Sequence, residues 1–146
     1  MCGNMKFKTE DESIVYLINQ LVKSGYTDVE CTSGESKFSH YDVRSKNPIN
    51  GTSQEYEIKR RDFKSDKYED CIMEDIKYHS FLNDKHNGDT DTGWLVNFYD
   101  DCWTVSDVYN PINFTKTIAS HCTEFKDKKK IIKGYYHYKF DYRYEY

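Results

Sequence analysis

The chain has 146 residues, of which 32% are charged, and a formal net charge of −4 at neutral pH. This length can bury a single hydrophobic core, so we expect one domain spanning residues 1–146. The acidic balance excludes a protein that coats nucleic acid through overall positive charge, and a nucleic-acid site has to be local. Aromatic residues make up 16% of the chain and supply core material, which argues against disorder over most of its length.

The cysteines are odd in number and widely spaced, without a C-x-x-C pair, which is typical of free thiols in a reducing compartment. No apolar run approaches the length of a signal sequence or a membrane span, so we expect a soluble, cytoplasmic protein without a membrane partner. The single alanine and the abundance of Lys, Asn, Asp, Tyr and Ile indicate AT-rich codons. That bias fits a viral or phage gene, whose product would act in the host cell cytoplasm.

Residues 9 to 24 are predicted to form the first helix. Its apolar positions recur at helical spacing, namely Ile14, Val15, Leu17, Ile18, Leu21 and Val22. Thr9 and Glu12 fit a capping box, and Gly25 is placed to end the helix. A first strand is expected over residues 26 to 32, followed by a turn at Ser33-Gly34.

The stretch from His40 to Lys67 is predicted to form a hairpin around a turn of Asn, Pro and Gly residues at 47 to 51. In an extended strand, alternate side chains point to opposite faces. One face therefore carries charged residues and the other carries Tyr56 and Ile58; the charged residues are Glu55, Glu57, Lys59 and Arg61. If the first strand of the hairpin places Asp42 beside them, two carboxylates and an ammonium group converge. These groups can hold a divalent cation and a phosphate together.

Asp42 followed by Glu57-Ile58-Lys59 resembles the signature of the PD-(D/E)XK nucleases, which comprise restriction-endonuclease-like and Holliday-junction-resolvase-like enzymes. Residues 10 to about 108 also follow the element order of that family, with residues 109–146 as a C-terminal extension; Tyr41 stands where the family often has proline. The resemblance implies an α/β (α+β) fold. Its central mixed sheet is flanked by helices in an αβββαβ core, with an extra C-terminal strand.

The resemblance also implies a catalytic set of Asp42, Glu57 and Lys59. Mg²⁺, with Mn²⁺ as a substitute, would be held by both carboxylates and by the main-chain carbonyl of Ile58, and the substrate would be nucleic acid, with DNA favoured. Three auxiliary positions follow from the same resemblance: Asp11 of the first helix, Arg61 and Lys77. Two of them have a plainer interpretation, because Asp11 also suits a helix N-terminus and Lys77 also suits the solvated flank of a helix.

A second helix is predicted from Ser65 to about Asp84, then a loop over residues 86–93 and strands at 94–99 and 103–108 joined by Asp100-Asp101. Residues 110–134 carry little signal, and their lysine run at 126–133 is typical of a solvated loop. From Tyr136 to Tyr146 aromatic and charged residues alternate, which predicts one strand with an aromatic face. We expect this face to pack on the core or on a second copy in a homodimer, with base stacking as the alternative.

A catalytically inactive protein with a nuclease fold, which binds nucleic acid or a host protein, is the alternative function. The net acidity of the chain favours it. The complete set of Asp42, Glu57 and Lys59 favours the enzyme, because a binding protein has no need to keep these charged groups together.

Overall fold

A computed structural model of the chain describes residues 7–32, 41–67, 71–124 and 130–146. The elements follow one another as α1 (Glu10–Lys23), β1 (Thr27–Cys31), β2 (Val43–Lys46), β3 (Ser53–Arg60), β4 (Cys71–Glu74), α2 (Asp75–Asn87), β5 (Thr92–Phe98), β6 (Trp103–Asp107), a short 3-10 helix (Pro111–Asn113), β7 (Phe114–Glu124), β8 (Lys130–Tyr138) and β9 (Tyr142–Tyr144).

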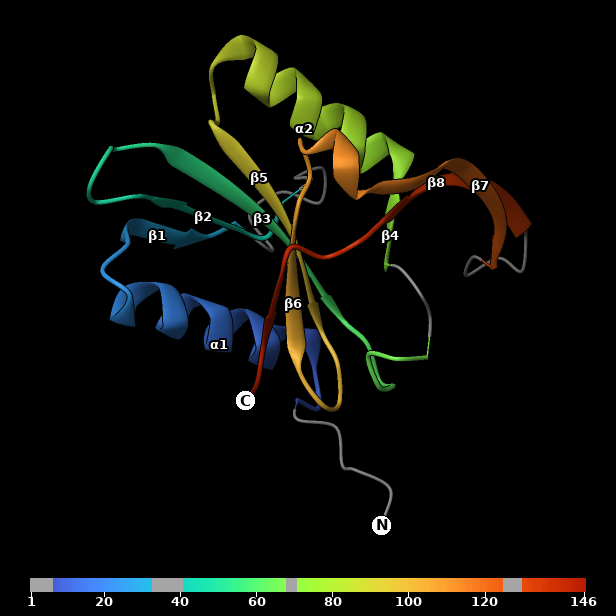
Figure 1. The fold of residues 1–146 in the computed structure, drawn as a ribbon, viewed down its shortest axis with the longest axis horizontal. Helices are drawn as coiled ribbons and strands as arrows, with labels where there is room; N and C mark the ends of the chain where they lie inside the picture. Colours follow the sequence, from blue (N-terminus) through green and yellow to red (C-terminus); the bar gives the residue numbers. More distant parts are fainter. Residues whose placement is uncertain (1–6, 33–40, 68–70, 125–129) are drawn as a thin grey trace.

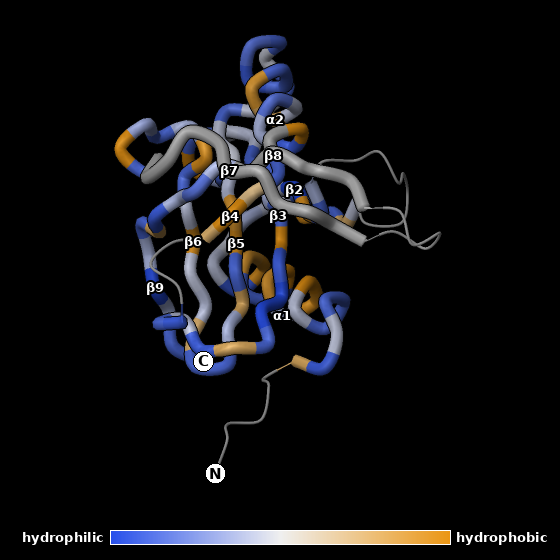
Figure 2. Tube along the Cα trace, turned by 90° about the vertical axis from the view of Figure 1, so that its right-hand side faces the viewer, coloured by the Kyte–Doolittle hydropathy of each residue, from blue (hydrophilic) through white to orange (hydrophobic). Residues whose placement is uncertain are grey.

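Within these ranges, the main sheet has six strands in the order β1-β2-β3-β5-β6-β9, and a smaller sheet has three in the order β4-β8-β7. The pairing of β3 with β5 is parallel, whereas the other pairs of the main sheet are antiparallel. The helices α1 and α2 lie on opposite sides of the main sheet (Figures 1 and 2). The predicted fold class, a mixed sheet flanked by helices, is therefore confirmed.

Helix α1 begins and ends close to the predicted residues. The Thr9 hydroxyl accepts a hydrogen bond from the Glu12 N–H at 3.2 Å, as a capping residue does. The Glu12 carboxylate in turn accepts from the Lys8 N–H at 2.9 Å. Gly25 has a φ of +89°, a conformation that costs glycine little and ends the helix.

The two faces of the main sheet carry separate hydrophobic clusters. On the α1 side, Leu17 and Leu21 pack with Tyr56, Ile58 and aromatic neighbours. On the α2 side, Phe81 packs with buried residues of β4, β5 and β8 and with Val108, just after β6; the strand residues include Met73, Leu95 and Tyr138. Because alternate residues of β3 face the α1 cluster, the residues between them must face α2.

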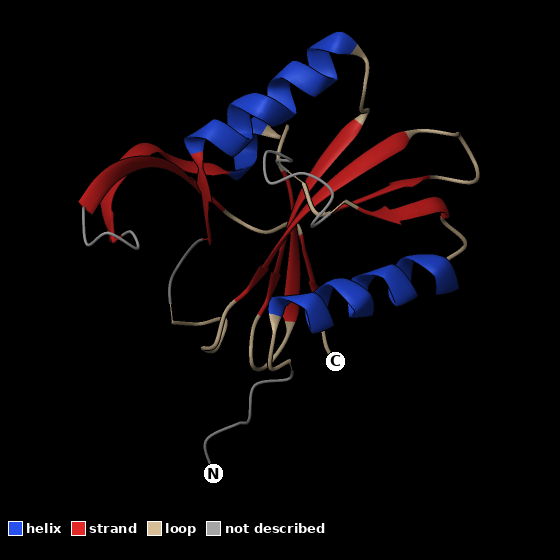
Figure 3. Cartoon of the chain, turned by 180° about the vertical axis from the view of Figure 1, so that it is seen from behind, coloured by secondary structure: helices blue, strands red, loops and turns tan. Residues whose placement is uncertain are grey.

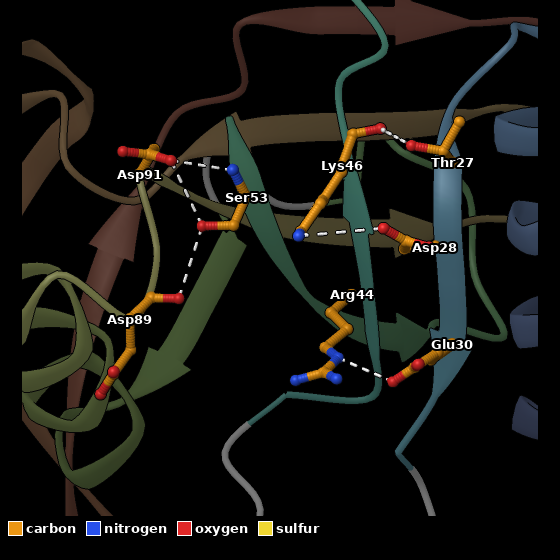
Figure 4. A network of polar contacts seen from close by, with 8 residues as sticks. All are labelled: Thr27, Asp28, Glu30, Arg44, Lys46, Ser53, Asp89 and Asp91. Atoms are coloured by element: carbon orange, nitrogen blue, oxygen red, sulfur yellow. Dashed lines mark hydrogen bonds and ion pairs between the residues drawn. The ribbon is translucent and has the colours of Figure 1, made fainter. Parts of the chain in front are cut away.

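Polar contacts fix the outer strands in register. On β2, the Arg44 Nε lies 2.8 Å from a carboxylate oxygen of Glu30 on β1. The N–H of Ser53 on β3 donates to the carboxylate of Asp91, just before β5, at 2.8 Å. Figure 4 shows these contacts together with their neighbours on the same strands. They join β1 to β2 and β3 to the start of β5.

The second helix is shorter than the sequence predicted. It begins at Asp75 rather than Ser65, because Cys71–Glu74 form strand β4, which pairs with β8. Cys71 and Met73 are buried and alternate with partly exposed residues, so this short stretch has the period of a strand. Lys77 still lies on the helix, in its first turn.

The C-terminal tail is not the single strand that the aromatic alternation predicted. Strand β8 ends at Tyr138, and the chain crosses to the main sheet, where β9 pairs with β6 (Figure 3). Asp141 holds the crossing, since its carboxylate accepts from the Asp107 N–H at 2.6 Å. Tyr138 is fully buried, but Tyr142 and Tyr144 remain 53% and 43% exposed, so the core of this chain does not cover the whole aromatic face.

Two expectations fall outside the described residues, namely the turn at Ser33-Gly34 and the lysines at 126, 128 and 129. Across the part of the chain that is described, no helix is long and apolar enough to cross a membrane.

A Gly93→Ala substitution tests how closely α2 approaches β5. The new Cβ would lie 2.8 Å from the Phe81 ring and 3.2 Å from the Tyr109 ring, so these rings or α2 must shift and stability should fall by about 1 to 3 kcal/mol. Denaturant unfolding measures the change. Because Phe81 causes the clash, Gly93→Ala should cost less in a Phe81→Leu background. Gly51→Ala is the control, since nothing lies within 4 Å of that position and its φ is +68°, so its cost should not depend on Phe81. Equal costs of Gly93→Ala in both backgrounds would contradict this account.

Candidate active site

Asp42 directly precedes β2, at the point where the pairing of β2 with β3 ends. The pairing of the two strands ends at Val43 opposite Tyr56, and the Asp42 N–H donates to the Tyr56 carbonyl at 2.8 Å. The Asp42 carboxylate then accepts a hydrogen bond from the Ile58 N–H at 2.9 Å. This bond takes the place of the one that a further main-chain residue of β2 would make if the pairing continued. Asp42 is thereby fixed beside the Glu57-Ile58-Lys59 segment, as the hairpin predicted.

Glu57 is the most buried of the predicted charged site residues, with only 2% of its side chain exposed. One of its carboxylate oxygens, Oε1, contacts two ammonium groups. The Lys77 Nζ lies 2.5 Å away and the Lys59 Nζ lies 3.3 Å away. Strand β3 and helix α2 therefore supply cations to the same buried oxygen.

The electrostatics of this cluster follow from burial and from like and unlike charges. Burial, and then repulsion from Asp42, raise the pKa of Glu57, while Lys77 and Lys59 act in the opposite direction. Burial acts to lower the pKa of Lys77, but attraction and hydrogen bonding to Glu57, together with attraction to Asp42 and Glu74, outweigh it and the pKa is raised. The two pKa shifts together describe a buried carboxylate that depends on its ammonium partners.

Arg61 lines the same cleft as Lys59 and Lys77, a space of about 160 Å³. Its guanidinium donates through Nε to the Asn97 side-chain oxygen at 3.0 Å and through Nη2 to the Ile72 carbonyl at 3.4 Å. Both acceptors are fixed in strands, so Arg61 is held near the floor of the cleft.

The available oxygen atoms suit a magnesium ion. A strand residue directs its N–H and its carbonyl to the same edge, so the Ile58 carbonyl points toward Asp42, past the end of β2. Asp42, Glu57 and this carbonyl form a set of hard oxygen donors, and Mg²⁺ commonly uses one or two carboxylates and keeps several waters. The donor set therefore fits the ion that the resemblance implies.

The structure does not bring the predicted helix acid into this cluster. Asp11 is exposed in the first turn of α1, and Glu12 bonds to the Lys8 N–H. Among the described residues, no group of three or more acidic, histidine or cysteine side chains lies close enough to hold a metal ion. Of the three auxiliary positions, Arg61 and Lys77 line the cleft, and Asp11 does not.

Two residues near the cleft were not predicted from the sequence. Asn97 is fully buried, and it lies opposite Lys59 in the register of β3 and β5. An asparagine inside the apolar run Trp94–Phe98 is unusual for a strand, and this could have indicated from the sequence that Asn97 has a special role. Glu74 also lines the cleft, but the predicted helix included it and so concealed its place before the first turn of α2.

A solved structure has a similar fold. The chain matches Hjc, a Holliday junction resolvase from Archaeoglobus fulgidus, with a TM-score of 0.52 and 14% sequence identity, over 68% of this chain and 72% of that chain. The chain has the fold of a Holliday junction resolvase. At this identity the likeness shows the fold alone, and that fold is the one that the resemblance of the motif implied. The sequence matches no protein-family model and no curated protein.

A double-mutant cycle tests whether Glu57 and Lys77 stabilise the resolvase fold as a pair. In the presence of a chelator, Lys77→Met should lower the free energy of unfolding by about 1 to 3 kcal/mol, because Glu57 loses its nearer partner. Glu57→Gln should cost less, since it also removes the repulsion from Asp42. The double variant should cost less than the two single changes together, by about 0.5 to 3 kcal/mol. Additive effects in denaturant unfolding would mean that the contact contributes nothing.

Proposed function

We propose that the chain is a metal-dependent endonuclease that hydrolyses phosphodiester bonds in DNA, with branched DNA as its substrate class. The observation that carries the proposal is the meeting of Asp42, Glu57 and Lys59 at the end of the β2–β3 pairing. The resolvase fold supports it, because the protein that shares the fold acts on Holliday junctions.

Asp42, Glu57 and the Ile58 carbonyl would hold Mg²⁺ or Mn²⁺. When bound there, the ion supplies Lewis acidity and offsets the charge of the scissile phosphate. Asp42 contributes a carboxylate whose position is fixed by the Ile58 N–H, and Glu57 contributes one that is buried and weakly screened.

Lys59 would act on the substrate directly. Its ammonium group points into the cleft from β3, with 30% of the side chain exposed, so it can reach a phosphate at the cleft mouth. There it would donate hydrogen bonds to the oxygens on which negative charge develops and orient the attacking water. Arg61, held by Asn97, would bind a neighbouring phosphate and so fix the position of the DNA strand along the cleft.

The test is cleavage of a labelled four-way DNA junction in Mg²⁺ or Mn²⁺, with linear duplex, single-stranded DNA and RNA as further substrates. Asp42→Ala, Glu57→Ala and Lys59→Ala should each lower the rate by about 10²- to 10³-fold, as expected for groups that stabilise developing charge. A chelator should stop the reaction.

Glu30→Gln is the matched control, because Glu30 is an exposed acid of β1 that pairs with Arg44 outside the cleft. It should cleave like the wild type. Cleavage that survives all three alanine substitutions would place the activity elsewhere. A wild-type protein that binds the junction without cutting it in either metal would favour the inactive binding protein.

A further inference from the structure

The candidate site is electrically balanced by its own side chains. Two carboxylates, Asp42 and Glu57, stand with two ammonium groups, Lys59 and Lys77. Both ammonium groups contact the same oxygen of Glu57, whose side chain is 2% exposed. The Glu57 carboxylate that would bind a metal ion is therefore already paired with two cations of the chain.

The two lysines are not equivalent. Lys59 belongs to the same strand as Glu57 and is separated from it by one residue, whereas Lys77 reaches over from α2 and makes the shorter contact, 2.5 Å against 3.3 Å. Lys77 also keeps 24% of its side chain exposed and lines the cleft. A long, flexible side chain in this position can turn its ammonium group toward a ligand in the cleft.

A divalent cation at Glu57 would face both ammonium groups at short range, in a buried place where salt screens little. Repulsion would weaken metal binding as long as Lys77 holds the Glu57 oxygen. A phosphate in the cleft removes this obstacle, since it offers Lys77 a new anionic partner and brings negative charge beside the metal.

We propose that Lys77 is a positioning residue that closes the metal site with its own charge until a phosphate of the DNA draws it away. The inference rests on the proposed function, because it takes Glu57 as a metal ligand and DNA as the substrate. Metal and DNA then bind cooperatively. By linkage, each raises the affinity for the other by the same factor.

The test measures Mn²⁺ affinity from the electron paramagnetic resonance signal of free Mn²⁺, with and without a four-way junction built with phosphorothioate linkages to resist cleavage. Without DNA, Lys77→Gln should bind Mn²⁺ at least about tenfold more tightly than the wild type, within the usual range of coupling between sites. The junction should raise the Mn²⁺ affinity of the wild type by a similar factor and that of Lys77→Gln much less. Lys77→Arg keeps the positive charge and should behave like the wild type.

Lys85→Gln is the control for a change of net charge on the same helix, because Lys85 lies near the end of α2 over the Tyr109 ring and outside the cleft. Its Mn²⁺ affinity should equal that of the wild type. Equal affinities of Lys77→Gln and the wild type would overturn the inference while leaving the metal site in place. If neither protein binds Mn²⁺, both the inference and the proposed metal site are wrong. Should circular dichroism show Lys77→Gln to be unfolded, the wild type alone decides, and an affinity that the junction does not change overturns the inference.

Discussion

The hydrogen bond from the Ile58 N–H to the Asp42 carboxylate determines how the rest of the site is built. Strand β3 continues past Tyr56, where its pairing with β2 ends, and its edge would otherwise need another main-chain partner. An aspartate at this point satisfies the exposed N–H and sets a carboxylate beside Glu57. The same side chain thus ends a strand pairing and begins the candidate site, which explains why the hairpin alone defines all three proposed catalytic groups.

Because side chains alternate along β3, its two faces have different roles. Tyr56 and Ile58 pack against α1, and their burial supplies the hydrophobic free energy that holds the strand in place. Glu57 and Lys59 face α2, where the approach of the helix brings Lys77 to the buried carboxylate. Packing on both faces of the sheet therefore buries Glu57 away from water. The free-energy cost of burying its charge is offset by the ammonium groups of Lys59 on β3 and Lys77 on α2.

The parts of this architecture that depend on local signals could be predicted from the sequence. The cap at Thr9, the hairpin turn and the apolar runs of β5 and β6 each act within a few residues, so α1, the motif strands and the charged face of β3 were foreseen. Strand β4 was not, because it has four residues and pairs with β8, whose pairing residues lie more than 60 positions later. The separation of the tail into β8 and β9 was missed for the same reason, because it depends on the contact of Asp141 with Asp107, which is distant in the sequence. For Asn97, the partner Arg61 becomes apparent only when β3 and β5 lie side by side.

The range of these contacts along the chain also bears on the order in which the molecule folds. The β2–β3 hairpin closes a short loop, which costs little chain entropy, so Asp42 and Glu57 can approach each other early. The parallel pairing of β3 with β5 and the docking of α2 require longer loops and are expected to form more slowly. Early intermediates would then hold two neighbouring carboxylates without Lys77. A divalent ion present during folding would meet its ligands before the competing cation arrives, so the rate of folding itself should respond to the metal.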